Sequence, residues 1–167
     1  ELVHEGVLTM EVSLPRTVYQ GQRPAEFFEG LVTRLSAVPG VQTVAAASSV
    51  PLAGTENLRQ VTIDGRPKPE PGKEVIADFR VVTGDYFRAM GMPIVKGRPL
   101  QAADRPTDPP VAVINETMAR VVFPGVDPVG RRLQTGPGAS SPWITVVGVV
   151  GDIRHNSLEV APPPEIY

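Results

Sequence analysis

The sequence predicts an α+β fold, and three patterns along its 167 residues support this class. The first fifty residues have a β-α-β order of strand-like and helix-like segments. Residues 59–82 contain two alternating segments with a turn-rich connection, and residues 143–150 are almost wholly apolar. The 19 prolines and 16 glycines are spread along the chain, which indicates many short elements joined by tight turns.

The first three elements follow from the apolar pattern and its interruptions. Residues 7–14 alternate loosely between apolar and polar and predict a strand. Residues 23–38 predict a helix, because Pro24 suits the first helical position and Pro39-Gly40 would end the helix. Residues 41–47 then predict a second strand. The apolar face of the helix is expected to comprise Phe27, Phe28, Leu31, Val32 and Leu35.

The middle of the chain predicts a hairpin followed by short elements. Residues 59–64 and 74–82 alternate and are expected to pair with each other. Thr83 is expected to cap a short helix, and Pro93–Lys96 forms a short extended piece. The buried side of that helix would carry Tyr86, Phe87 and Met90.

The last third of the chain predicts three further strands, a helix and an extended end. Residues 111–114 form a short apolar strand, and Asn115 is a good N-cap for a helix that follows at once. Residues 131–135 predict another strand, and residues 143–150 predict a central one because they are apolar and β-branched. The last residues, after 162–164, are extended. The helix would bury Met118, Val121 and Val122.

Composition excludes several classes of protein. The chain has no cysteine, so disulfides, thiolate zinc sites and cysteine nucleophiles are absent. The 16 basic and 18 acidic residues give a net charge of -2, which argues against a nucleic-acid module. No stretch approaches the ~18 apolar residues that span a bilayer. The chain starts at Glu1 without an initiator Met and ends just after a proline run, so we interpret it as a piece of a longer protein.

The turn after the apolar strand holds the strongest candidate for chemistry. Asp152 and His155 could form an acid–base or metal-binding pair, with Arg154 between them. The only other histidine, His4, is distant in sequence, and no second ligand stands at metal spacing. The competing interpretation is a solvated turn, and we favour it.

Two other sets of polar residues are weaker candidates. Asp104 and Asp108 lie four apart, but Pro106 interrupts any helix between them, and no calcium-loop pattern surrounds them. Ser48 and Ser49 follow a strand without a G-x-S-x-G elbow, so they are expected to be polar residues at a strand end.

The remaining motifs have simple structural interpretations. Gly148–Gly151 lacks the third glycine of a phosphate loop and favours close backbone packing. The sequon at residues 115–117 coincides with the predicted helix cap, and we treat it as chance. Arg131, Arg132 and Arg154 lack interleaved aromatic residues, which is untypical of nucleic-acid binding. The residues by themselves therefore favour binding, transmission or scaffolding over catalysis, without a cofactor.

Four segments together point to a family. They are LSAVPGVQTVAA at 35–46 followed by VPL, VTGDYFRAMGMPIVKGRP at 82–99, VAVINETMARVVFPGVDPVGRR at 111–132, and ITVVGVVGDIR at 144–154 with PPPEIY at the end. In this order they resemble the extracytoplasmic (periplasmic) core domain of MacB-type, FtsX-like ABC transporter permeases. The resemblance is greatest to the large permeases in which two such domains alternate with membrane segments, and it covers residues 7–167.

The resemblance implies one extracytoplasmic core domain over residues 1–167, with two lobes. Residues 1–52 would begin a porter-like lobe, residues 55–155 would form an inserted, smaller β-rich lobe carrying short helices, and residues 156–167 would be a truncated return segment. The motif residues would set turns, bends and a helix cap: Gly84, Gly91, Gly97, Gly125, Gly130, Pro39, Pro128 and Asn115.

The function implied by the resemblance is not enzymatic. The domain would couple ATP-driven motion of transmembrane helices to substrate efflux or partner docking on the extracytoplasmic face of the inner membrane. No catalytic, cofactor-binding or metal residue follows from it, and no partner-binding residue can be named. The implied partners are the transmembrane helices of the same chain, an ABC ATPase subunit or domain, and a periplasmic adaptor or carrier protein.

Two alternatives stay open. The first is a lipoprotein-release or division-type permease domain that docks a carrier or a hydrolase. The second is a hydrolase that uses the turn with Asp152 and His155.

Overall fold

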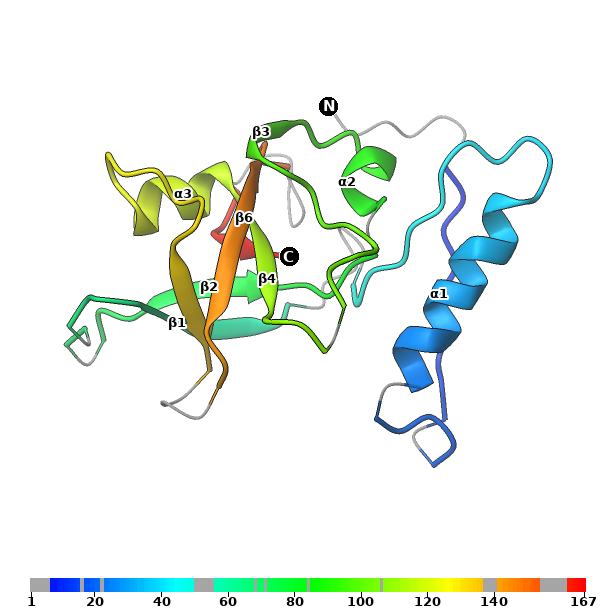
Figure 1. Cartoon of the computed structure of the whole chain (residues 1–167), viewed down its shortest axis with the longest axis horizontal. Coiled ribbons are helices and arrows are strands. Elements are labelled where there is room, and N and C mark those ends of the chain that lie inside the picture. The colour runs from blue at the N-terminus through cyan, green and yellow to red at the C-terminus, as the bar shows by residue number, and fades with distance from the viewer. Residues whose placement is uncertain are drawn as a thin grey trace.

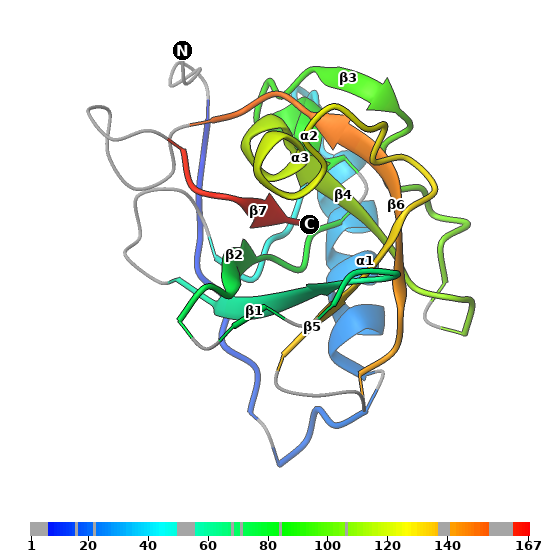
Figure 2. The same ribbon diagram turned by 90° about the vertical axis from the view of Figure 1, so that its left-hand side faces the viewer.

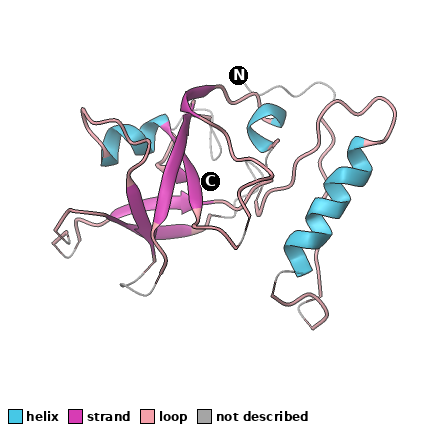
Figure 3. Ribbon diagram, in the orientation of Figure 1, coloured by secondary structure: helices cyan, strands magenta, loops and turns pink. Residues whose placement is uncertain are grey.

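The computed structural model describes residues 7–15, 17–21, 23–49, 56–67, 69–70, 72–83, 85–105, 107–136, 141–153 and 162–167. The elements follow in the order α1 (Arg23–Ser36), β1 (Leu58–Ile63), β2 (Val75–Phe79), α2 (Tyr86–Ala89), β3 (Ile94–Gly97), β4 (Val111–Asn115), α3 (Glu116–Val122), β5 (Arg132–Thr135), β6 (Ile144–Val150) and β7 (Glu165–Ile166). One mixed sheet with a few short helices confirms the predicted α+β class (Figure 3).

The strands form a sheet that closes on itself. Their order is β3-β6-β4-β7-β2-β1-β5, and an additional pairing joins β5 back to β6. The β1–β2 pair is the predicted antiparallel hairpin, while β4–β6 and β2–β7 are parallel. We call the ring formed by β1, β2, β4, β5, β6 and β7 the closed sheet; Figure 2 shows its strands curving around a common interior.

Strand β6 is the most connected strand, as its apolar sequence predicts. Along one edge it pairs with β4, and along the other it pairs first with β5 and then with β3. The backbones of β3 and β6 approach closely at two glycines. A Cβ on Gly148 would lie 2.1 Å from the carbonyl oxygen of Arg98, and a Cβ on Gly97 would lie 2.2 Å from that of Val147. The glycine pattern around Gly148 is therefore a packing requirement, as expected.

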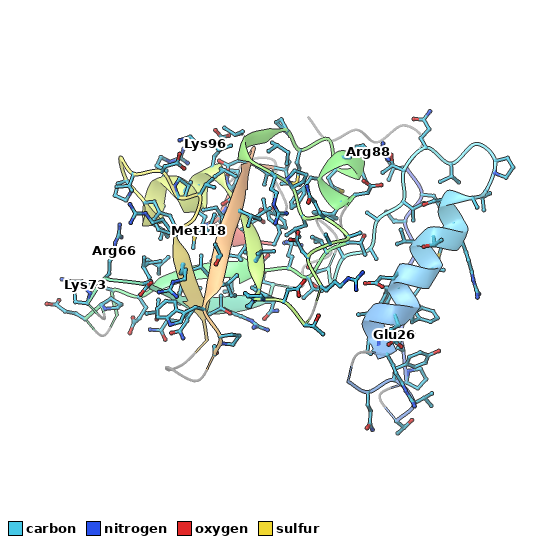
Figure 4. All side chains as sticks on the ribbon, viewed as in Figure 1. Glu26, Arg66, Lys73, Arg88, Lys96 and Met118 are labelled. Carbon is cyan, nitrogen blue, oxygen red and sulfur yellow. The ribbon has the colours of Figure 1, made fainter. Side chains whose placement is uncertain are left out.

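The core has two clusters. The main cluster lies inside the closed sheet, where Met118 of α3 is fully buried against side chains of β4, β5 and β6 (Figure 4). The second cluster joins α2 to the sheet and is aromatic. It contains Tyr86, Phe87, Met92, Val113, Val150 and Tyr167, with Ala45 and Ala47 packed against it.

Helix α3 begins where predicted. The side chain of Asn115 accepts a hydrogen bond from the Met118 backbone N–H at 2.8 Å, as an N-cap does. Met118 and Val122 are buried, but Val121 is 50% exposed, so its assignment to the apolar stripe was wrong. Helix α3 spans only Glu116–Val122, and its buried residues are Thr117, Met118 and Val122.

Helix α1 has the predicted position and face, but it contains no buried residue. The five apolar residues of its predicted face are only half-buried. Figure 1 shows α1 standing apart from the sheet, with the extended N-terminal run beside it. We call described residues 7–45 the α1 part of the molecule.

Both strands predicted to flank α1 were wrong. Residues 7–14 form no strand, and residues 41–47 contribute only an isolated bridge between Ala47 and Val82. An alternating pattern makes a segment suitable for a sheet, but a strand also needs a neighbour to supply hydrogen bonds. Among the described residues, no strand pairs with 7–14, and only Ala46 and Ala47 of the second segment bond to a neighbouring stretch, at Val82 and Thr83.

The cap of α2 differs from the prediction, and the last residues of the chain have a place in the sheet that was not predicted. The N-cap of α2 is Asp85 and not Thr83, whose hydroxyl instead accepts a hydrogen bond from the Ala46 N–H at 2.8 Å. Residues 165–167, assigned by resemblance to the return segment, lie in the closed sheet, because β7 pairs with both β2 and β4.

Candidate functional site

The candidate pair at the turn after β6 cannot be assembled from the described residues. Asp152 accepts hydrogen bonds from the Thr117 backbone N–H at 2.9 Å and from the Thr117 hydroxyl at 2.8 Å. Its carboxylate therefore satisfies a free N–H of the first turn of α3. His155, like His4 and Arg154, lies outside the described residues.

The carboxylates of the loop after β3 do not form a pair. Asp104 accepts two hydrogen bonds from the Arg98 guanidinium at 2.7 and 2.8 Å, and another from the Gln101 N–H at 2.8 Å. The hydrogen bond from Arg98 is the main reason that the pKa of Asp104 lies below its ordinary value. Asp108 instead accepts from the Arg105 N–H at 3.4 Å. Each carboxylate holds its own stretch of the loop.

Of the three basic candidates, Arg132 is paired and Arg154 lies outside the described residues. Arg132 donates to Asp64 at 2.9 Å through Nε, and its guanidinium lies 5.7 Å from the ring centroid of Trp143. This pairing links β5 to the end of β1.

Asn115, the residue of the chance sequon, is fully buried and ties three segments together. Its Oδ1 accepts from the N–H groups of Met118 and Glu165, and its Nδ2 donates to the Pro163 carbonyl at 2.9 Å. One side chain thus caps α3 and holds β7 in the sheet. Asn115 is 0% exposed, which agrees with a structural interpretation of the sequon.

We searched the described residues for a metal-binding group and for a membrane-spanning helix. Within the described ranges, no group of three or more His, Cys, Asp or Glu side chains could hold a metal ion. The helices among those residues are also too short or too polar to cross a bilayer.

The most unusual polar feature is a buried ion cluster that the sequence did not reveal. Asp78, Arg80 and Glu165 are each no more than 2% exposed. Arg80 Nη2 lies 2.5 Å from Asp78 Oδ2 and 3.8 Å from Glu165 Oε1. A buried charge is tolerated only when it is paired and hydrogen-bonded, so these contacts hold the side chains together.

Two tyrosines complete the cluster. The Tyr167 hydroxyl donates to Glu165 Oε2 at 2.5 Å, and its ring packs edge-on against Phe87. Burial raises the pKa of Tyr86 to about 12, and burial beside Glu165 raises the pKa of Tyr167 well above its ordinary value. Among the described residues, the Tyr86 hydroxyl and Arg80 Nε have no hydrogen-bond partner.

The cluster lies where the chain passes from the α1 part into the sheet. Residues 46–49 run antiparallel to residues 80–83, and we call this pair of segments the junction. Backbone hydrogen bonds join Ser48 N–H to the Val81 carbonyl at 2.8 Å and Thr83 N–H to the Ala46 carbonyl at 2.9 Å. The Ser48 hydroxyl also accepts from the Val81 N–H at 3.1 Å.

Sequence reasoning missed this cluster for a definite reason. In the alternation of residues 74–82, Asp78 and Arg80 occupy the polar positions, which normally face water. Here both side chains are buried, and Arg80 contacts Glu165 of β7 and Ser49 of the junction. The only available signal was a pair of opposite charges two residues apart in the predicted strand 74–82, Asp78 and Arg80, because such residues lie on one side of a strand.

Comparison with known proteins identifies the class. The MacB-like periplasmic core domain family matches residues 6–163, so the chain belongs to this family. It is an extracytoplasmic domain of an ABC transporter permease, as the resemblance implied. None of the curated proteins matches the chain in sequence.

Solved structures share the fold. The periplasmic region of MacB from Actinobacillus actinomycetemcomitans is similar with a TM-score of 0.55 and 19% identity, over 77% of this chain and 52% of that one. The extracellular domain of the noncanonic ABC-type transporter YknZ from Gram-positive bacteria is similar with a TM-score of 0.54 and 16% identity, over 84% and 61%. A permease-protein domain from Porphyromonas gingivalis is similar with a TM-score of 0.53 and 19% identity, over 80% of this chain and 54% of that one. The chain therefore spans between half and two thirds of each of these structures.

Proposed function

We propose that the chain is a non-catalytic relay in its permease, coupling ATP-driven motion of the transmembrane helices to substrate efflux or partner docking outside the membrane. The single observation that carries this proposal is the family match over residues 6–163. Its partners are then the transmembrane helices of the same polypeptide, an ABC ATPase, and an extracytoplasmic adaptor or carrier. Residues 1–52, 55–155 and 156–167 remain our proposed lobe divisions.

The geometry supports a mechanical role over a chemical one. The described candidate side chains Asp152, Asp104 and Asn115 are each engaged in holding backbone. A closed sheet has few free edges, so it can move as one body. A relay needs such a body and a firm attachment to whatever moves it.

The test measures the distance of the domain from the membrane surface and asks whether ATP changes that distance. Full-length permease with its ATPase is placed in proteoliposomes, and a clickable dye replaces Lys73, which lies at the far tip of the β1–β2 connection (Figure 4). Energy transfer to an acceptor on lipid headgroups should change when ATP is added and not when ADP is added. A second dye at Glu26 on α1 serves as an independent site.

Two outcomes contradict the proposal. If neither dye moves relative to the lipid under ATP, the domain is not a relay. If Asp152→Asn and His155→Ala abolish a hydrolytic activity of the intact permease outside the membrane, the enzyme alternative is correct.

A further inference from the structure

Among the described residues, the chain passes from the α1 part to the closed sheet through the junction. The described part of this passage ends at Ser49, which contacts Arg80, and resumes before β1 with Asn57, which contacts Asp78. Figure 1 shows the segment that follows α1 as the visible link from the helix to the sheet. A contact that holds Ser49 limits how the α1 part can turn about the junction.

Ser49 and Asn57 are held by the same buried ion pair. Arg80 Nη1 donates to the Ser49 hydroxyl at 2.8 Å and to the Ser49 carbonyl at 3.3 Å. Asp78 Oδ1 accepts from the Asn57 N–H at 2.9 Å, while its other oxygen accepts from Arg80. The pair Asp78–Arg80 therefore holds Ser49 and Asn57 at one place, at the end of β2.

We infer that Asp78 and Arg80 are positioning residues that fix the α1 part on the closed sheet. The inference rests on the proposed relay function, because it names the contact through which motion of one part would reach the other. A buried guanidinium offers five directed donors and so sets one geometry, whereas apolar packing alone permits several.

Apolar packing at the junction is too slight to do the same. On the side that leads from α1, only Ala45 and Ala47 pack against the aromatic cluster, and each offers a single methyl group; Val82 packs there from the other strand of the junction. The backbone contacts at Ala46 and Ser48 restrain the strand direction but end before Ser49. Arg80 supplies the contact at the last residue before the loop.

The experiment measures the spread of distances between dyes at Glu26 and Lys73 in single molecules of the full-length permease. The first variant is Asp78→Asn/Arg80→Met, which removes both charges together and retains an amide oxygen for the Asn57 N–H. We expect its distance distribution to be at least twice as wide as that of the parent protein. The stability control is Met118→Ala, which damages the main core away from the junction and should leave the width unchanged.

A reversible staple tests the mechanism. The chain has no cysteine, so Ala47→Cys/Val82→Cys places one pair across the antiparallel bridge, where strand spacing suits a disulfide. Any cysteines elsewhere in the permease are first replaced. Oxidation should return the Asp78→Asn/Arg80→Met protein to the parental width, and dithiothreitol should widen it again.

Several results would overturn the inference. It is wrong if Asp78→Asn/Arg80→Met keeps the parental width, if Met118→Ala widens the distribution equally, or if the staple has no effect. Should the double variant fail to fold, Ser49→Ala decides: it should widen the distribution, whereas Ser36→Ala on the surface of α1 should not. Equal widths for these two would refute the inference. None of these measurements requires ATP, so they are independent of the lipid-distance test of the relay proposal. Either proposal can therefore fail in its own test while the other passes.

Discussion

The closed sheet and the helix packed inside it bury a core of apolar side chains, whereas α1 buries none. Ile114, Met118, Leu133 and Val146 are 0% exposed, while the apolar face of α1 is only half-covered. Both regions have the apolar pattern that their secondary structure requires. The difference teaches that a pattern yields stability only when a second surface covers it, and here the strands cover one another but only a short extended run lies beside α1.

The largest effect is expected where β3 and β6 touch. Gly148→Val places a side chain against the Arg98 carbonyl, so β3 must separate from β6, at a cost of about 3–5 kcal/mol in unfolding free energy. The matched control is Gly30→Ala in α1, where a Cβ meets nothing within 4 Å. That change should stabilise the helix by up to ~1 kcal/mol. Urea unfolding of both variants checks the contrast, and similar midpoints would contradict it.

The next effect compares two positions on α3. Met118→Ala should lower the free energy of unfolding by about 2–4 kcal/mol, because it leaves a cavity in the main core. Val121→Ala, at a position that is half exposed, should change it by roughly 0.5 kcal/mol or less. Thermal melts of the two variants measure this. A larger loss at Val121 would mean that this surface is covered in solution.

Alkaline pH should weaken the sheet side of the junction. The pKa of Tyr86 is about 12 when folded and 10.0 ordinarily, so the folded protein keeps a proton that the unfolded chain loses between these values. The contribution of Tyr86 to the free energy of unfolding is fully present below pH 10. Above that pH it is lost at roughly 1.4 kcal/mol per pH unit, until the folded pKa is reached. Tyr167 contributes in the same direction.

Tyr86→Phe provides the check on this titration. The phenylalanine variant should retain its stability at pH 7, since the Tyr86 hydroxyl has no hydrogen-bond partner among the described residues. Its stability should also decline less steeply above pH 10. Urea midpoints from pH 8 to 12 measure the stability of both proteins. If the two lose stability equally as the pH rises, this hydroxyl is not the titrating group.

The smallest effect is expected in α1 itself. Leu31→Ala removes a half-buried side chain, so the free energy of unfolding should fall by no more than about 1 kcal/mol. Hydrogen exchange gives an independent view, because amides of α1 should exchange by local opening and those of β6 only by global unfolding. A loss of several kcal/mol for Leu31→Ala would mean that α1 is covered by another surface.

Local signals were sufficient for most of the elements. Asn115 before an apolar run predicted the start of α3, and Pro39-Gly40 placed the end of α1 within a few residues. The β-branched run before Gly151 predicted the central strand β6. These predictions succeeded because caps, helix-ending residues and β-branched side chains act on their immediate neighbours.

Predictions failed where a distant segment decides the outcome. Residues 7–14 have a strand pattern but no strand beside them, and Val121 lies at apolar spacing but outside the core. Asp78 and Arg80 occupy positions that alternation assigns to water, yet they are buried. Local periodicity contains no information about which face another part of the chain will cover.

Local patterns in the amino-acid sequence were enough to predict the α+β class, the order of the elements in the sheet, the absence of cysteine chemistry and the family suggested by four ordered motifs. The folded chain was needed to show that β5 returns to β6 to close the sheet, that β7 lies between β2 and β4, and that a buried ion pair holds Ser49 of the junction. The physical reason is range: turns, caps and side-chain alternation act over a few residues, whereas strand pairing and the burial of charge depend on segments far apart in the chain.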